Sequence, residues 1–360
     1  MERRLAWIGL NQLPSLTPRR RRLLLAKLGG PEGVWGASPH QLSRVVGEQA
    51  AANLAAERRQ ADPEREVALA RRAGARILTW EDDSFPQELR QIPSPPLVLY
   101  VVGELRPEDV PGVAVVGTRR CTSYGRLVAE RLGSELAGRG ITVVSGLAPG
   151  VDTAAHRGAL KAGRTVAVLG SGLGRPYPAG SGPLLERIAR AGAAVSEFPW
   201  EMTGTKWSFP RRNRIIAGLS AGVVVVEAPA RSGALITVDR ALQQGKEVFA
   251  VPGPITSTAS QGTHRLIQEG AKLVTGVEDV LAELPSLRPA PPLEPAGEEG
   301  PVVDGPARTV YDLLSFEPLG LSELVDKAGL SHSCVAQALV ELELAGLIRE
   351  VAGRRYVRTR

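Results

Sequence analysis

Residues 113–146 read VAVVGTRRCTSYGRLVAERLGSELAGRGITVVSG, and this stretch decides the fold class. It begins and ends with two apolar runs, Val113–Gly117 and Ile141–Gly146, and the segment between them, Gly125–Arg139, is amphipathic. Neither run alternates apolar with polar residues, which is typical of strands buried on both faces. The order strand, helix, strand predicts a βαβ unit with parallel strands.

The same pattern recurs further along the chain. We expect four more strands at Thr165–Gly170, Ala193–Phe198, Gly222–Ala228 and Glu247–Gly253, with helices at Val151–Ala162 and Gly233–Gly245. Strands and helices that alternate in this way predict a doubly wound α/β fold. We therefore expect an extended Rossmann-like parallel sheet over about residues 75–284.

Residues 1–70 differ from this core because they are rich in Ala, Leu and Arg and have a helical period. They predict an N-terminal helical domain. Thr17 and Pro18 are a typical N-cap and first helical residue, and Gly29 is expected to end that helix. Its first two turns contain the arginines Arg19–Arg22, which the positive end of the helix dipole disfavours. An external anion would explain them, and a solvated basic face is the alternative.

The C-terminal part of the chain begins with a proline-rich segment. Residues 285–306 contain seven prolines and are predicted to form an extended linker. Helices are expected over Ala307–Ser315, Leu321–Gly329 and Ser333–Ala345, followed by a hairpin within Ile348–Arg358. This order predicts a winged-helix domain over residues 307–360.

The composition excludes some classes of protein. Lys and Arg number 44 against 38 Asp and Glu, so the net charge is +6, which suits an anionic partner without proving one. Two cysteines, Cys121 and Cys334, and four scattered histidines predict neither disulfides nor a metal site. No apolar run approaches the ~20 residues that span a bilayer, and no signal peptide is recognisable. We expect a cytoplasmic protein without membrane insertion.

Ligands of a parallel sheet bind where the carboxyl ends of the strands lead into helices. Gly- and Ser-rich loops follow the expected strands here at Gly117–Arg120, Ser145–Asp152 and Gly170–Gly174. Such loops let backbone N–H groups approach an anion closely. They predict an extended anionic ligand or a large nucleotide at one edge of the sheet.

Residues 206–214, with the sequence KWSFPRRNR, contain four cations and two aromatic residues. Cations neutralise phosphates, and aromatic faces stack on unpaired bases, so this combination favours single-stranded nucleic acid. We expect this segment to be a loop that supplies Phe209 for stacking. The alternative is that Trp207 and Phe209 belong to the core and that the arginines pair with acidic residues.

Several longer strings resemble the DprA/Smf family. They are the string from Phe209 to Ser220, VSGLAPGVD at Val144–Asp152, RSGALIT at Arg231–Thr237, and the Val251–Gly253 motif with Gly262-Thr263. They span roughly residues 75–284 in the family's order. The resemblance implies a homodimeric protein that binds single-stranded DNA without sequence preference, displaces single-strand-binding protein and loads the RecA recombinase in natural transformation. It implies no enzyme activity and no cofactor.

The resemblance also implies residue roles. The DNA-binding residues that it implies are Arg119, Gly172, Lys206, Phe209, Arg212, Asn213, Arg214 and Ser232. The Arg-Asn-Arg triplet at 212–214 can also brace its own segment. The dimer interface is expected near His264, Ile267 and Leu273, where a short helix and an edge strand end the α/β domain. The N-terminal domain resembles the SAM-like or helix–hairpin–helix-like domain of the family.

The sequence is also compatible with other functions. A dinucleotide-dependent enzyme is suggested by Gly170–Gly174, but the spacing is GxGxG rather than GxGxxG. A LOG-type nucleotide-cleaving enzyme has a similar sheet, but its Pro-Gly-Gly run is replaced by Pro252-Gly253-Pro254. Asp152 and His156, one turn apart, could form an acid–base pair, and we expect Asp152 to be a helix N-cap instead. A sequence-specific regulator is disfavoured because the third expected winged-helix helix is acidic; protein contact is the expected main role of that domain.

Overall fold

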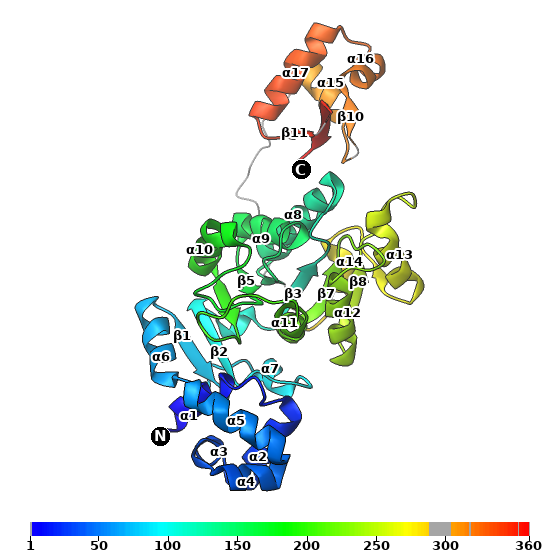
Figure 1. Cartoon of the computed structure of the whole chain (residues 1–360). Coiled ribbons are helices and arrows are strands. Elements are labelled where there is room, and N and C mark those ends of the chain that lie inside the picture. The colour runs from blue at the N-terminus through cyan, green and yellow to red at the C-terminus, as the bar shows by residue number, and fades with distance from the viewer. Residues whose placement is uncertain (1, 288–303, 317, 352, 360) are drawn as a thin grey trace. The chain divides into compact units, whose positions relative to one another are not determined.

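The computed structural model describes residues 2–287, 304–316, 318–351 and 353–359 (Figure 1). These residues form two compact units. One unit contains residues 2–121 and 129–287, and the other contains residues 122–128 and the described residues from 304 onward. Most of the linker predicted from the prolines lies outside the described residues.

A nine-stranded sheet forms the centre of the first unit, in the order β1-β2-β6-β5-β4-β3-β7-β8-β9. Its strands are β1 (Arg76–Thr79), β2 (Val98–Gly103), β3 (Gly112–Val116), β4 (Val143–Ser145), β5 (Thr165–Val168), β6 (Ala193–Ser196), β7 (Ser220–Val225), β8 (Glu247–Ala250) and β9 (Lys272–Leu273). The seven strands from β6 to β9 in this order are parallel, and β1 and β2 add an antiparallel edge. The predicted parallel α/β core is therefore confirmed.

The order of the strands creates a topological switch point. The chain moves outward from β3 through β4 and β5 to β6, then returns to place β7 beside β3 and continues to β8 and β9. Helices α9 and α10 cover one face of the sheet, and α11 and α12 cover the other (Figure 1). In such sheets the crevice beside the first strand is where ligands bind.

The helices of this region follow the apolar periods of the sequence. They are α7 (Gln87–Gln91), α8 (Ser123–Gly138), α9 (Val151–Ala162), α10 (Gly182–Ala191), α11 (Ser208–Gly218), α12 (Ala234–Gln243), α13 (Gln261–Gln268) and α14 (Val277–Glu283). Helix α9 has the predicted bounds, and α12 lies within its predicted segment.

The expectation of a loop at residues 206–214 is wrong, because helix α11 begins at Ser208. The Thr205 N–H donates to Ser208 Oγ (2.9 Å), and the Ser208 N–H donates to Thr205 Oγ1 (3.3 Å). Pro210 lies in the first turn of the helix, where its missing N–H breaks no intrahelical bond. Phe209 and the arginines after it therefore lie on a helix.

Six helices precede the sheet: α1 (Arg3–Asn11), α2 (Pro18–Leu28), α3 (Pro31–Gly36), α4 (Pro39–Val46), α5 (Glu48–Gln60) and α6 (Pro63–Arg72). Helix α2 has its expected ends, because the Thr17 side chain accepts from Arg20 N–H and Gly29 is left-handed at φ 72°. Trp7, Ile8 and Leu24 of these helices join Tyr100 of β2 in one apolar cluster. The helical region thus packs on the sheet edge, and the domain boundary near residues 70–75 stays a prediction.

The C-terminal unit consists of α15 (Gly305–Leu313), β10 (Leu319–Gly320), α16 (Leu321–Ala328), α17 (His332–Leu344), β11 (Ile348–Val351) and β12 (Arg355–Arg358). The strands pair in the order β10-β12-β11, and Val310, Leu324 and Leu339 lie in a separate apolar core. This arrangement confirms the predicted winged helix. The additional strand β10 has only two residues, too few to give a period in the sequence.

Candidate functional site

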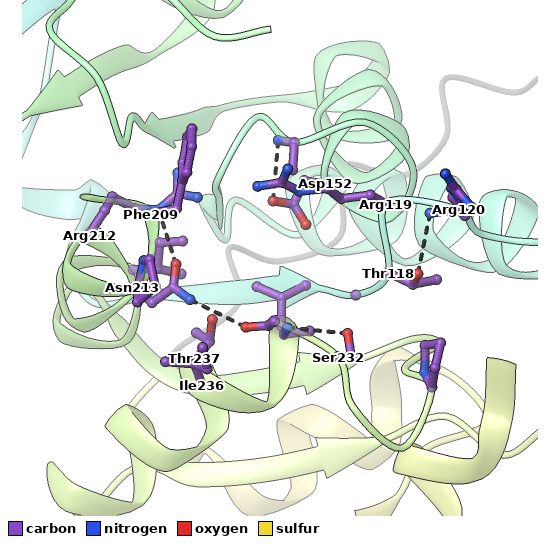
Figure 2. Close-up of a pocket in the computed structure, with 18 of the residues that line it drawn as sticks. Thr118, Arg119, Arg120, Asp152, Phe209, Arg212, Asn213, Ser232, Ile236 and Thr237 are labelled. Carbon is purple, nitrogen blue, oxygen red and sulfur yellow. Dashed lines mark hydrogen bonds between the residues drawn. The ribbon is translucent and has the colours of Figure 1, made fainter. Parts of the chain in front are cut away.

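A pocket of about 940 Å³ lies at the carboxyl ends of β3 and β7, at the switch point of the sheet (Figure 2). Its walls are the loop 117–120 after β3, the loop 229–234 after β7, and the first turns of α11. Figure 2 shows Phe209 and Asn213 from α11 facing Arg119 and Ser232 from the two loops. The pocket is at the upper end of the ~300–1,000 Å³ range of ligand sites.

Positive charge dominates this pocket. Among the described residues its charged lining consists of Arg119, Arg120, Lys206, Arg212 and Arg231, with Asp152 as the single carboxylate. Arg119, Arg120, Lys206 and Arg231 are exposed, whereas Asp152 is buried beside Arg212. Because the buried pair neutralises itself, the exposed cations of the rim are left to attract an anion.

The ring of Phe209 lies in a slot between two glycines. A β-carbon at Gly170 would come within 2.4 Å of the ring, and one at Gly204 within 2.7 Å, so only glycine fits at either position. The ring is half-buried, and Tyr177 lies beside it with the ring centroids 5.2 Å apart. The Arg119 guanidinium carbon is 5.2 Å from the Phe209 centroid and 6.0 Å from that of Tyr177. Two aromatic rings and a planar cation thus meet at one wall, as stacking on a base requires.

Arg212 lies beneath the pocket and is only 4% exposed. Its Nη1 donates to the carbonyls of Gly146 (2.7 Å) and Val168, at the ends of β4 and β5. Burial and the nearby Arg119 lower the pKa of Arg212 to about 10, although Asp152 opposes them. The side chain ties α11 to two strand ends.

Arg214 lies on another side of α11 and does not line the pocket within the described residues. It is 7% exposed, and its Nη2 is 2.5 Å from Glu197 Oε2. Gly172 is buried and is not among the described residues that line the pocket; the carbonyl oxygens of Pro199 and Trp200 lie within 2.2 Å of where its β-carbon would stand. Direct DNA contacts by Gly172, Arg212 and Arg214 stay predictions, and their observed contacts are internal.

Asn213 joins the two walls, and Ser232 makes a local contact within the connection after β7. Asn213 Nδ2 donates to Gly233 O at 3.5 Å, and Ser232 Oγ accepts from Ala234 N–H at 3.3 Å. Both side chains line the pocket. The Asn213 contact holds the loop after β7 against α11, and the Ser232 contact braces that loop at the start of α12.

The structure gives Asp152 and His156 structural partners. The expectation that Asp152 is the N-cap is wrong, because Gly150 has that position; Asp152 instead accepts from Gly146 N–H (3.2 Å) and Ala148 N–H (3.4 Å). Burial raises the pKa of Asp152 to about 6. His156 is fully buried with Nδ1 2.7 Å from Thr165 Oγ1, and burial lowers its pKa to about 3. Within the described ranges no three potential ligand side chains group as a metal site.

The residues expected at a dimer interface lie on and after α13. His264 Nε2 is 2.9 Å from Gly253 O, Ile267 is half-buried against the sheet core, and Leu273 is 42% exposed. Leu273 is thus the most available of the three for a partner, and the interface stays a prediction. In the described part of the chain no helix has the length and apolar content to cross a membrane.

Three of the aromatic and cationic residues that line the pocket were absent from the predicted site: Tyr177, Arg120 and Arg231. Tyr177 stands in a Pro-rich turn between β5 and α10, and nothing local in the sequence marks it as a partner of Phe209. The positions of Arg120 and Arg231 could have indicated them, because both follow the strands that flank the switch point. This can be recognised only once the order of the strands in the sheet is known.

Comparisons with known proteins agree with this architecture. A family model described as DNA recombination-mediator protein A matches residues 76–285, and a DprA winged helix domain model matches residues 288–354. Protein Smf of Synechocystis sp. is 32% identical, covering 98% of this chain and 98% of its own length. Protein Smf of Escherichia coli is 40% identical, covering 79% of this chain and 77% of its own length.

Solved structures give the same result. DNA processing protein A from Streptococcus pneumoniae superposes with a TM-score of 0.66 at 38% identity, covering 76% of this chain and 95% of that one. DNA processing protein A from Helicobacter pylori, studied for its single-stranded DNA binding mode, gives 0.53 at 30% identity, covering 59% and 98%. With its Rossmann-like core, its winged helix and these relatives, the chain belongs to the DNA recombination-mediator protein A family, the DprA/Smf proteins.

Proposed function

We propose that this protein binds single-stranded DNA in the pocket at the switch point and acts as a stoichiometric binder rather than a catalyst. The observation that carries the proposal is the wall formed by Phe209, Tyr177 and Arg119 beside a rim of exposed cations. Such a combination suits unpaired bases joined by phosphates. The Helicobacter pylori relative, studied for its single-stranded DNA binding mode, supports it.

In this proposal the exposed cations bind the backbone of the DNA. Arg119 and Lys206 neutralise phosphates, and one base stacks on Phe209. Asn213 and Ser232 line the floor between the walls, where their polar groups can contact a sugar or phosphate. The buried side chains of Arg212 and Arg214 hold α11 in place.

The wider role follows the family. We propose a homodimer in the cytoplasm that protects incoming single strands in natural transformation or recombination, displaces single-strand-binding protein and loads RecA. Two pockets on one dimer would raise the affinity for a long strand through avidity. The exposed Leu273 and the half-buried Ile267 and His264 support an interface at the end of the sheet.

Fluorescence anisotropy tests the binding proposal. A labelled oligo-dT and a duplex of equal length are titrated with the full chain at low and moderate salt. We expect the single strand to bind more tightly, with an affinity that falls steeply as salt is added. Equal or weak binding of both would overturn the proposal and favour a nucleotide ligand, for which a thermal-shift screen of nucleotides is the next step.

A further inference from the structure

Helix α11 presents a second functional face that does not line the pocket. Phe209 and Asn213 point to the pocket, whereas Trp207, Arg211 and Arg214 follow one another at spacings of four and three residues, which places them on one other side of the helix. Trp207 and Arg211 are absent from the pocket lining in the described part of the chain. The two faces meet at the N-terminal end of α11.

Trp207 is unusual among the tryptophans because it is 52% exposed, while Trp7 and Trp200 are 5% and 8% exposed. It packs edge-on against Phe198, with ring centroids 5.9 Å apart at 78°. The Arg211 guanidinium carbon is 5.9 Å from the Trp207 centroid and 5.7 Å from that of Phe198. An exposed indole beside a cation is a platform on which a base can stack.

Positive charge exceeds negative charge around this platform. Glu197 is the carboxylate that both Arg211 and Arg214 contact, at 3.1 and 2.5 Å. Asn11, at the end of α1, donates to Glu197 O at 2.8 Å and so brings the N-terminal helices to this place. Burial first, and then the nearby charges of Arg214 and Arg211, lower the pKa of Arg21 of α2 to about 10. One carboxylate thus faces three guanidinium groups.

The neighbouring arginines of α2 have no acidic partner of their own. Within the described residues no ion pair is formed by Arg19, Arg21 or Arg22, and Arg19 and Arg22 are exposed. The turn before them is not free for a ligand, because Ser15 N–H donates to both oxygens of Glu57 (3.1 and 3.0 Å). An anion at this end of α2 would therefore meet arginine side chains rather than backbone.

We propose that a single strand bound in the pocket continues around the N-terminal end of α11 onto a second surface, formed by Trp207, Arg211, Arg21 and Arg22. The proposal rests on the proposed function. Lys206 connects the pocket to the second surface, because it lines the pocket and directly precedes Trp207. On this second surface Trp207 stacks on a base, and Arg21 and Arg22 bind the phosphates that follow it.

The experiment uses oligonucleotides of two lengths with the full chain. Oligo-dT of about 5 nucleotides fills the pocket only, and oligo-dT of about 15 nucleotides reaches the second surface. We expect Trp207→Ala to weaken binding of the long strand roughly tenfold, the loss of one stacked base, and to leave the short strand unchanged. Trp207→Phe keeps a ring and restores most of the affinity.

Arg22→Ala is the second variant, because an exposed side chain without a partner can be removed without harm to folding. We expect it to lower the slope of log affinity against log salt by about 0.7 for the long strand only, which is the loss of one phosphate contact. Arg72→Ala, at the end of α6, makes the same change of charge and should leave both slopes unaltered.

The outcomes separate this inference from the proposed function. If the wild-type protein binds neither length, the proposed function fails. If it binds both and the Trp207 and Arg22 variants match it at both lengths, the second surface is wrong and the pocket stands. Equal weakening of short and long strands by Trp207→Ala also overturns the inference, because the tryptophan then acts on the pocket.

Discussion

The segment from Lys206 to Arg214 contains two kinds of cation that the sequence does not distinguish. Arg212 and Arg214 are 4% and 7% exposed and bond to protein groups, whereas Lys206 and Arg211 are exposed. Their positions on α11 explain the difference: Lys206 precedes the helix, Arg212 reaches the ends of two strands, and Arg214, one turn after Arg211, reaches Glu197 in the interior. Charge in a segment predicts an anionic partner, but only the helix reveals which charges remain available for one.

The two kinds of cation differ in energy as well as in position. A guanidinium taken out of water must be compensated by bonds inside the protein, so removing it leaves its partners unpaired. An exposed cation contributes little to stability and is free to bind phosphate. The predictions below test this division, from the largest expected effect to the smallest.

Arg212→Ala should destabilise the protein by about 3–5 kcal/mol, because it leaves the buried carbonyls of Gly146 and Val168 without their donor and the buried Asp152 without its neighbouring cation. Chemical denaturation of the full chain, followed at the transition of the first unit, measures this change. Arg120→Ala removes an exposed charge from the same pocket and should alter stability by less than about 0.5 kcal/mol. Unchanged stability of Arg212→Ala together with lost DNA binding would instead assign Arg212 a direct contact.

The buried histidine gives a second test, by pH. Burial lowers the pKa of His156 to about 3, from about 6.5 in an unfolded chain, so its contribution to stability is complete above pH 6.5 and is lost as pH falls towards 3. Between pH 6.5 and 5 the loss amounts to about 1.6 kcal/mol. Between pH 6.5 and 5 the unfolding free energy of His156→Gln should therefore fall by about 1.6 kcal/mol less than that of the wild type.

Asp152 titrates in the opposite direction, which makes the comparison with wild type necessary. The pKa of Asp152 is raised to about 6, so its contribution is complete below pH 4 and is lost as pH rises through 6. Because both proteins contain Asp152, their difference isolates His156. Parallel loss of stability in the two proteins would show that His156 is not held neutral by the fold.

The parallel core could be predicted because its valines are buried on both faces. The runs that became β3 to β8 lack polar alternation, and the spacing between them leaves room for helices. The edge strands β1 and β2 were missed for a physical reason. Leu97 to Val101 is also fully apolar, but β2 pairs antiparallel with both neighbours and belongs to no βαβ repeat.

The site was predictable in part. Arg119, Lys206 and Phe209 were found from the sequence and line one pocket, because each belongs to the connection that follows the carboxyl end of a strand. Tyr177 was missed because its contact with Phe209 joins residues 32 positions apart. The burial of Arg212 could not be predicted, because it depends on hydrogen bonds to the carbonyls of Gly146 and Val168, which are distant in the sequence.

Phe209→Ala should weaken binding of oligo-dT about tenfold, or roughly 1.4 kcal/mol, because it removes the stacking face from between Gly170 and Gly204. Anisotropy titration measures the change. Tyr177→Ala removes the neighbouring ring and should have a smaller effect of the same sign. If Phe209→Ala binds as the wild type does, the aromatic wall is part of the core only.

Lys206→Ala should have the smallest effect, a severalfold loss of affinity for single strands, because it removes one exposed phosphate contact and no packing. Its signature is the salt dependence: the slope of log affinity against log salt should fall by about 0.7, while the stability of the fold stays unchanged. Lys246, which directly precedes β8, lies at the amino end of the strands, away from the pocket. Lys246→Ala therefore makes the same change in net charge without touching the site. If the salt slope falls in both Lys206→Ala and Lys246→Ala, the whole basic surface attracts the strand. The difference between exposed and buried cations would then not decide which of them bind DNA.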